Sequence, residues 1–430
     1  MQVKLFPLFL FILSCSLSHS KNSLIKAHFV HHNGYSETIT EREKLRLIEQ
    51  GDFSHSSPYK KVLKVYQVHN QNETKALLTS YHSNGQIKQS LEIENGRARG
   101  MYGEWFAKGI KKLEISVHGG EPDFGEEVEK SWIFHGLGSV WNEEGKLIAQ
   151  IPYEEGMLHG EMIRYFPHGS VKETLPIERG KLSGTVKKFY PNGALKSSNE
   201  YHLGVREGTS LTFSPDGTLL REEEYERGLL DCGRYFSFEG KLLTTIEKGR
   251  GWRVLLSSDS SHTWKEYQNG KAEGEVRLFT REGALRRLYH LHKGLMEGED
   301  WEYYPVEELP PVITPSLQEK LPLPKLLVNW RENCLQGVIK TWYSSGQLET
   351  QREMSKNKKQ GITSAWYLNG SLMYIEEYDQ NFLKRGTYFK KDEYNPISKV
   401  SDGMGMATLF DSEGNLLRKI SYEGGLPIVS

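Results

Sequence analysis

The sequence lacks a dominant charge, a disulfide framework and, after its first residues, any long apolar run. Its 55 basic and 56 acidic side chains nearly balance, and neither sign forms a long block. This argues against binding to nucleic acid, or to a membrane surface through a basic patch. With only three cysteines, the chain is not expected to rely on disulfides. No stretch beyond the N-terminus approaches the roughly 18 apolar residues of a membrane-spanning helix, so we expect the mature chain to be soluble or tethered only by its end.

Signatures of catalysis and of metal binding are also scarce. The sequence contains no Gly-x-Ser-x-Gly, His-Glu-x-x-His or Walker pattern. The cluster of His28, His31 and His32 has no accompanying cysteine or carboxylate pair, so we interpret it as part of a solvated segment. Runs of carboxylates are interpreted as solvated strand surface, because adjacent strand residues point to opposite faces: Glu154-Glu155, Glu222-Glu223-Glu224 and Glu376-Glu377. We predict no catalytic residue, no metal ligand and no cofactor, and hence no enzyme.

Glycine, by contrast, recurs with a fixed spacing of 24 residues. It opens successive units at Gly136, Gly160, Gly184 and Gly208, and the same spacing separates Gly274 from Gly298 and Gly337 from Gly361. A fixed period of this length indicates a repeat architecture, in which each unit buries its apolar face only against its neighbours.

Each unit has the pattern of a β-hairpin. The sixth residue from the opening glycine is aromatic, and a turn ending in glycine follows four residues later, as in Phe189 and Asn192-Gly193. Asn-Gly between two β-prone runs is a strong hairpin signal, because glycine takes a positive φ without steric cost. Leu195 and Tyr201 follow at an even spacing, which predicts a single apolar face. The sixth-position residues are Trp105, Trp141, Tyr165, Phe189, Phe213, Phe238, Phe279, Tyr303, Trp342, Trp366 and Phe410.

The units resemble the bacterial variant of the MORN (membrane occupation and recognition nexus) repeat. Residues 184–195 and 361–372 follow its Gly-x-x-x-x-aromatic-aromatic-x-Asn-Gly-x-Leu pattern closely, and the resemblance covers roughly residues 79–425, with gaps. It implies an all-β fold, an elongated antiparallel array of hairpins of about 24 residues, and says little about activity. Proteins of this type are often labelled antitoxin-like, which no residue here supports directly.

Interruptions of the period suggest the domain organisation. An acidic insertion follows Gly119, an irregular stretch follows Gly249, and residues 305–324 contain six prolines, which lack the donor that an interior strand needs. We predict a signal peptide at 1–20, an N-terminal cap module at 21–78, a repeat array at 79–304, a proline-rich linker or loop at 305–324 and a second repeat array at 325–430.

Residues 21–78 do not follow the repeat. Thr40 and Glu43 form a capping box and Gly51 ends the apolar run that follows, which predicts a helix over about 41–50. Residues 59–68 alternate as a strand does. We interpret this module as a cap over the open edge of the first hairpin; the alternative is a dedicated recognition module.

The first residues have the three-part layout of an export signal, with Lys4, an apolar run over residues 5–13 and small residues after it. Two cleavage interpretations remain. Residues 12–15 resemble the lipobox of bacterial lipoproteins, in which Cys15 becomes the lipidated first residue, whereas residues 18–20 suit ordinary cleavage before Lys21. The corresponding location is the periplasm or outer membrane of a Gram-negative bacterium, or the medium.

If the sheet binds a partner, the candidate contact residues are the aromatic residues that directly follow a sixth-position aromatic residue. We call these the second aromatic residues. Strand alternation places each of them on the face opposite the sixth-position residue, and exposed aromatic stripes often contact glycans or peptides. Alternatively, these residues only pair across strands and stabilise the sheet. The candidates are Phe166, Tyr190, Tyr304, Tyr343 and Tyr367.

Taken as a whole, the sequence favours a non-catalytic, exported repeat protein, anchored in the cell envelope, that binds a protein or a glycan through its sheet. An antitoxin-like, toxin-neutralising protein is the alternative, on resemblance alone, and an unrecognised hydrolase is a third. We predict contact with a membrane only through a lipid on Cys15.

Overall fold

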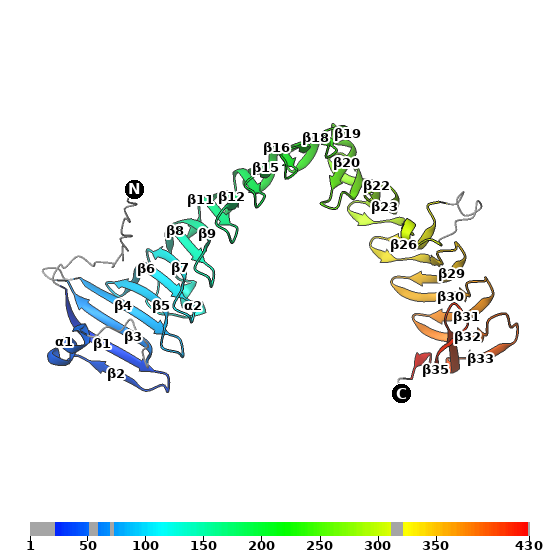
Figure 1. Cartoon of the computed structure of the whole chain (residues 1–430). Coiled ribbons are helices and arrows are strands. Elements are labelled where there is room, and N and C mark those ends of the chain that lie inside the picture. The colour runs from blue at the N-terminus through cyan, green and yellow to red at the C-terminus, as the bar shows by residue number, and fades with distance from the viewer. Residues whose placement is uncertain (1–21, 51–58, 69–72, 311–320, 429–430) are drawn as a thin grey trace, which may run out of the picture. The chain divides into compact units, whose positions relative to one another are not determined.

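The computed structural model describes residues 22–50, 59–68, 73–310 and 321–428 (Figure 1). Among these residues nearly all regular structure is β-strand, and paired strands run antiparallel. The predicted all-β array of hairpins, preceded by a short α/β segment, is confirmed. The chain divides into two compact units, residues 1–205 and 206–430. The predicted signal peptide and Cys15 lie outside the described residues.

In the first unit, β1 pairs with β2 and β3, and from β3 onward each strand pairs with the next long strand in the chain. Its elements are β1 (Ser23–His31), β2 (Ser36–Ile39), α1 (Arg42–Gln50), β3 (Tyr59–Gln67), β4 (Thr74–Tyr81), β5 (Ile87–Glu94), β6 (Arg97–Trp105), β7 (Lys111–Val117), α2 (Glu126–Glu129), β8 (Phe134–Trp141), β9 (Leu147–Glu154), β10 (Met157–Leu158), β11 (Gly160–Tyr165), β12 (Val171–Glu178), β13 (Lys181–Leu182), β14 (Gly184–Phe189) and β15 (Leu195–His202).

The second unit repeats this meander. Its elements are β16 (Val205–Phe213), β17 (Leu219–Glu226), β18 (Leu229–Phe236), β19 (Leu242–Glu247), β20 (Arg250–Leu256), β21 (His262–Gln268), β22 (Lys271–Phe279), β23 (Leu285–His292), β24 (Leu295–Met296), β25 (Gly298–Tyr303), the 3-10 helix η1 (Val306–Glu308), β26 (Pro324–Arg331), β27 (Cys334–Leu335), β28 (Gly337–Trp342), β29 (Leu348–Ser355), β30 (Lys358–Trp366), β31 (Leu372–Asp379), β32 (Phe382–Phe389), β33 (Pro396–Ser401), β34 (Met404–Phe410), β35 (Leu416–Glu423) and β36 (Leu426–Pro427).

The turn inside each hairpin that has a glycine at its tip is of a type that produces a β-bulge. Gly193 has a φ of 86°, whereas Asn192 is not left-handed. The Tyr190 N–H donates to the Ala194 carbonyl oxygen over 2.8 Å. A turn closed by a left-handed glycine in this way leaves one unpaired residue in the adjoining strand.

The pairing of β14 with β15 shows that bulge. Lys188 lies opposite Ser197, but Phe189, the next residue, lies opposite Leu195, so Lys196 is the extra residue. The same register shift precedes the sixth-position aromatic residue in hairpins of both units.

Because of the bulge, the two strands of a hairpin do not keep a single alternation. Leu195 lies on the face of Phe189, whereas Tyr201, opposite Gly184, lies on the face of Val186. The expectation that Leu195 and Tyr201 share one apolar face is therefore wrong. The bulge exchanges the two faces between them.

The buried face is that of the third residue from each opening glycine. Sixth-position aromatic residues are half-buried, apart from the buried Phe410. Third-position side chains that are buried are Tyr102, Val186, Ser210, Val276, Asp300, Ile339, Thr363 and Ala407. The sequence pattern also predicts Phe238 at the sixth position, and this prediction is wrong, because Phe238 lies in a turn. The register of β18 with β19 places Phe236 opposite Leu242, so Phe236 takes that role.

The N-terminal segment has the predicted helix, α1, and the predicted strand, β3, and both are confirmed. Leu45 of α1 is buried together with Phe29 of β1 and Val62 of β3. His28 and His31 are half-buried residues of β1, and His32 is exposed. The His28 imidazole contacts the Thr38 hydroxyl at 2.8 Å, and the interpretation of the three histidines as part of a solvated segment stays a prediction.

The acidic insertion folds back onto the sheet. Trp132, at its end, is 6% exposed and packs edge-on against Tyr102, with ring centroids 4.7 Å apart. Its indole N–H donates to the Glu121 carbonyl oxygen over 2.9 Å. The insertion thus covers part of the buried face of the first unit.

The residues that flank the proline-rich segment belong to paired strands. Tyr303, the last residue of β25, lies opposite Pro324, the first of β26, and η1 follows β25 directly. Residues 311–320 lie outside the described part. The domain boundaries predicted from the sequence stay a prediction.

Candidate binding surface

The second aromatic residues are less open to solvent than the sequence predicts. Tyr367 is 0% exposed, and Phe166, Tyr190, Tyr304 and Tyr343 are half-buried. For Tyr367 the expected position on a solvated face is wrong. Its role in binding was not decided by the sequence, and burial of the ring favours the stabilising alternative at this residue.

Three of these tyrosines join one repeat to the next. The hydroxyl of Tyr304 donates to the carbonyl oxygen of Trp342 over 2.5 Å, and Tyr343 donates to that of Trp366 over 2.9 Å. Tyr367 donates to the carbonyl oxygen of Phe389 over 2.8 Å. Burial raises the pKa of Tyr343 and of Tyr367 to about 12, so both remain protonated donors at neutral pH.

Phe166 and Tyr190 make other contacts. The ammonium of Lys172 lies 6.0 Å from the Phe166 ring centroid, and that of Lys196 lies 5.4 Å from the Tyr190 ring centroid. Both lysines are the extra residues of bulges. The bulge therefore places a cation over the aromatic ring, a geometry worth about 0.5–1 kcal/mol at exposed sites.

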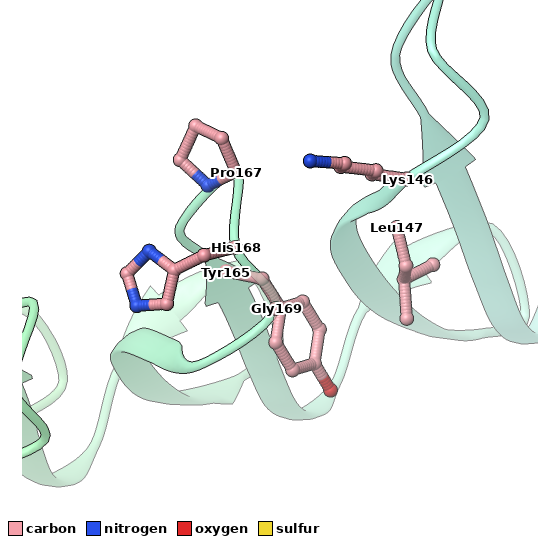
Figure 2. A pocket seen from close by; sticks show the side chains of 6 residues that line it. All are labelled: Lys146, Leu147, Tyr165, Pro167, His168 and Gly169. Atoms are coloured by element: carbon pink, nitrogen blue, oxygen red, sulfur yellow. The ribbon is translucent and has the colours of Figure 1, made fainter.

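The first unit has a shallow hollow (Figure 2). Its volume is about 360 Å³. The imidazole of His168 in its wall already contacts the Ser170 hydroxyl at 2.7 Å, and Lys146 supplies a positive charge. The lining residues are Lys146, Leu147, Tyr165, Pro167, His168 and Gly169. They come from adjacent hairpin turns, so the repeat spacing itself forms this hollow.

A row of exposed apolar side chains recurs where one hairpin passes to the next. Each follows a two-residue turn in which both residues have positive φ, the geometry of a type I′ turn. We call these residues the exposed row. They are 38% to 62% exposed. They are Met157, Val205, Leu229, Leu295, Phe382, Met404 and Leu426.

The last three members of the exposed row are carried by turns that touch one another. The Gly425 N–H donates to the Gly403 carbonyl oxygen over 2.9 Å, and the Leu383 N–H donates to the Gly425 carbonyl oxygen over 3.0 Å. Glycine is required at Gly425, where φ is 80° and a Cβ atom would lie 3.0 Å from the Leu383 carbonyl oxygen. These contacts fix Phe382, Met404 and Leu426 at one end of the strands.

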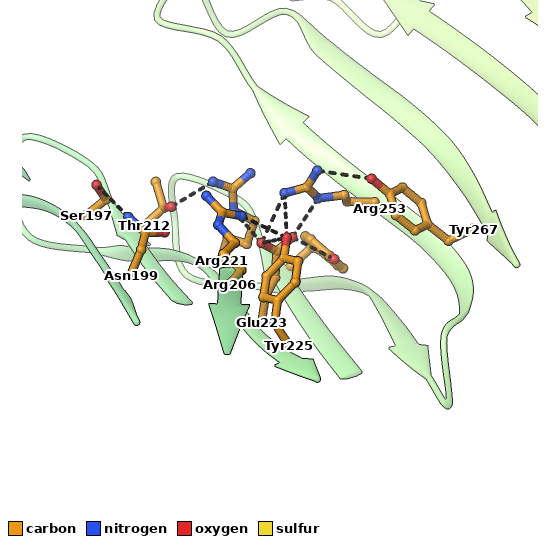
Figure 3. A network of polar contacts seen from close by, with 10 residues as sticks. Ser197, Asn199, Arg206, Thr212, Arg221, Glu223, Tyr225, Arg253 and Tyr267 are labelled. Atoms are coloured by element: carbon orange, nitrogen blue, oxygen red, sulfur yellow. Dashed lines mark hydrogen bonds and ion pairs between the residues drawn. The ribbon is translucent and has the colours of Figure 1, made fainter. Parts of the chain in front are cut away.

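The second unit also buries a charged cluster around Glu223, which is 0% exposed (Figure 3). The guanidinium of Arg253 binds its carboxylate twice, at 2.6 and 3.0 Å. The hydroxyls of Tyr225 and Tyr235 donate to it at 3.1 and 3.0 Å, and Arg221 lies 3.4 Å away. This cluster joins strands β17, β18 and β20.

The partners of Glu223 decide its ionisation. Burial acts to raise the pKa of the carboxyl group, but the Arg253 hydrogen bonds and the charges of Arg221 and Arg253 lower it below its usual value. The carboxylate is therefore ionised at neutral pH, as a buried ion pair requires.

Glu376 occupies an equivalent place without an arginine. It is 7% exposed, and the hydroxyls of Tyr388 and Tyr378 donate to it at 2.8 and 3.0 Å. Burial raises the pKa of Glu376, an effect that the two tyrosines and Lys359 only partly oppose. Each site thus holds a buried glutamate, but the pKa of Glu223 is lowered whereas that of Glu376 is raised.

The two clusters share a sequence pattern that the repeat period conceals. Residues 223–236 and 376–389 both read Glu-Glu-Tyr, then Leu five places after the tyrosine, then Gly-x-Tyr-Phe. A Cβ atom at Gly233 or Gly386 would lie 2.5 or 2.6 Å from the tyrosine hydroxyl two places later, so glycine leaves room for that ring. The interpretation of Glu223 and Glu376 as solvated strand surface is wrong, since the bulged pairing turns both inward.

Residues 182–202 and 206–227 match the family model of the MORN repeat variant. The chain contains MORN-variant repeats. Each matched segment spans one bulged hairpin, β14 with β15 or β16 with β17, and the same bulge recurs in hairpins outside the two segments. None of the curated proteins matches the chain. MORN-variant repeats are typical of binding or scaffold proteins without catalysis. Searched over its described residues, the chain contains no helix that is long and apolar enough to cross a membrane.

Proposed function

We propose that the chain is a non-catalytic, exported scaffold protein that binds a protein partner through the exposed row of its MORN-variant repeats. The observation that carries this proposal is the exposure of Phe382, Met404 and Leu426 on contacting turns. Contiguous exposed apolar side chains on a soluble surface are typical of protein interaction sites.

The repeat gives this surface a modular character. Turns at the same position in other hairpins carry charged residues, such as Lys181, Lys271 and Lys358. A partner is therefore distinguished by which turns are apolar and which are basic, and its specificity is set turn by turn. An apolar row suits protein better than glycan, because glycan sites stack sugar rings on open aromatic faces.

We propose further that Cys15 anchors the chain in the envelope of a Gram-negative bacterium. Its support is the sequence of residues 1–20. With a palmitate analogue as the metabolic label, the wild-type chain is expected to become labelled and to sediment with membranes, while Cys15→Ala loses label and sedimentation. Equal labelling of the two chains would contradict lipidation, and an unlabelled wild type whose mature chain begins at Lys21 would establish ordinary signal cleavage.

The exposed row is tested by affinity capture from the envelope fraction of the source cells. The variant with Phe382→Ser, Met404→Ser and Leu426→Ser is expected to retain less than about a tenth of the partner retained by the wild type, since a few apolar anchors carry most interface energy. Its melting temperature should change little, because all three side chains are exposed.

Tyr394→Ser is the matched control, since Tyr394 is 97% exposed and lies outside the row. It should retain the partner in full. Equal retention by the triple variant and the wild type, or an equal loss in the control, would overturn the assignment of the row as the binding surface.

A further inference from the structure

Two histidines and a glutamate meet in the first unit at the base of the acidic insertion. One ligand atom from each of His118, His135 and Glu155 lies within 4.8 Å of the others. The histidines are 17 positions apart and belong to no motif, so no pattern in the sequence groups them.

The backbone holds all three residues in place. The insertion closes at its base through the His118 N–H, which donates to the Ile133 carbonyl oxygen over 2.7 Å. His135 belongs to β8, where it lies opposite Ser116 of β7. Glu155 sits in the turn after β9, and that turn is fixed to β8 because the next residue, Gly156, donates its N–H to the Phe134 carbonyl oxygen over 2.8 Å.

The side chains are arranged as an open set of ligands. The two imidazole rings stack nearly parallel, with centroids 4.1 Å apart and an interplanar angle of 12°. His135 Nδ1 is a buried atom without a hydrogen bond, and it lies 3.4 Å from Glu155 Oε1. His118 and Glu155 are exposed, so their side chains are free to rotate toward a shared ion.

We propose that His118, His135 and Glu155 form a binding site for a divalent transition-metal ion of the zinc class. Two imidazole nitrogens and one carboxylate oxygen suit Zn²⁺, Ni²⁺, Co²⁺ and Cu²⁺, with water completing the shell. A tetrahedral ion with ligands at about 2.0–2.2 Å separates ligand atoms by about 3.4 Å, so side-chain rotation closes the set without backbone movement. The bound ion joins β8 to the turn after β9 and locks the base of the insertion.

The test uses equilibrium dialysis of the full chain against Zn²⁺ alone, with Cys15, Cys232 and Cys334 replaced by serine so that thiolates do not compete. One Zn²⁺ per chain is expected. The variant His118→Ala with His135→Ala should bind at least about 100-fold more weakly, because losing two ligands costs more than the roughly 10- to 100-fold that follows loss of the outer partners of a ligand. Zn²⁺ should also raise the melting temperature of the parent chain but not that of the variant.

His159→Ala is the matched control. His159 Nε2 lies 3.5 Å from Glu154 Oε2, outside the proposed set of ligands, so its loss should leave binding unchanged. The proposal is overturned if the parent chain takes up no Zn²⁺, if the double variant binds as tightly as the parent, or if His159→Ala removes binding. Circular dichroism that matches the parent's shows that the variant is folded. Co²⁺ spectra, which report nitrogen and oxygen ligands directly, then show whether the folded variant has lost the site.

Discussion

Replacing Arg253 with leucine is expected to lower the free energy of unfolding of the second unit by about 3–5 kcal/mol at pH 7. The substitution removes the bidentate partner of Glu223, whose carboxylate is 0% exposed. An ionised group is then left buried with only Arg221 and two tyrosine hydroxyls, and burial without a partner is costly. Urea denaturation followed by circular dichroism measures the loss.

Arg234→Leu is the matched control for this substitution. Arg234 pairs with Glu222 at 2.5 Å, but its side chain is 61% exposed, and exposed ion pairs contribute at most about 1 kcal/mol. A loss at Arg253 no larger than the loss at Arg234 would contradict the assignment of a buried ion pair.

The destabilisation caused by Arg253→Leu should also depend on pH. The pKa of Glu223 is lowered in the folded chain, so its stabilisation is present above the unfolded value of about 4.5 and is lost as the pH falls through the folded value. Without Arg253 the site resembles that of Glu376, whose raised pKa gives stabilisation that is present below about 4.5 and lost as the pH rises through the folded value. The destabilisation by Arg253→Leu is therefore expected to shrink as the pH falls from 7 toward 4.

The repeat and its turns were predictable because they depend on local chemistry. Glycine at the tips, β-prone residues on either side and a constant period are sufficient to predict hairpins such as β14 with β15. The stretch after Gly249 seemed irregular, yet β20 and β21 form a hairpin in which Ser260 takes the left-handed conformation, with φ of 66°. The Asp259 carboxylate accepts the Ser261 N–H over 3.0 Å, as the Asn192 side chain accepts the Ala194 N–H in a turn with glycine, so this turn forms with serine in the position that glycine takes elsewhere.

The faces of the strands were not predictable from alternation alone. A bulge adds one residue, so every side chain beyond it changes face. Glu223 and Glu376 lie on strands beyond such a bulge and face the core, although their acidic runs predict solvated surface. Tyr367 does lie on the face opposite Trp366, as alternation predicts, but that face, which it shares with Thr363 and Ala365, is the buried one. The apolar residues of the exposed row, by contrast, follow turns between hairpins at a constant position, which a position-by-position comparison of the repeats would have found.

The groups that depend on tertiary contact were beyond the sequence. Arg253 reaches Glu223 across 30 positions, and His118 reaches His135 across the acidic insertion. The number of residues between the two partners does not follow the repeat period in either case, because it depends on the segment that lies between them.

Cysteine labelling tests most directly the claim that bulged hairpins in both units bury their third-position side chains. In a chain with Cys15, Cys232 and Cys334 replaced by serine, Val186→Cys and Ala407→Cys are expected to react with a maleimide at least about 100-fold more slowly than Lys187→Cys and Met406→Cys, because reaction at a buried thiol requires local opening. Val186 is 4% and Ala407 1% exposed, whereas Met406 is 42% exposed. Equal rates for the two members of each pair would contradict the account.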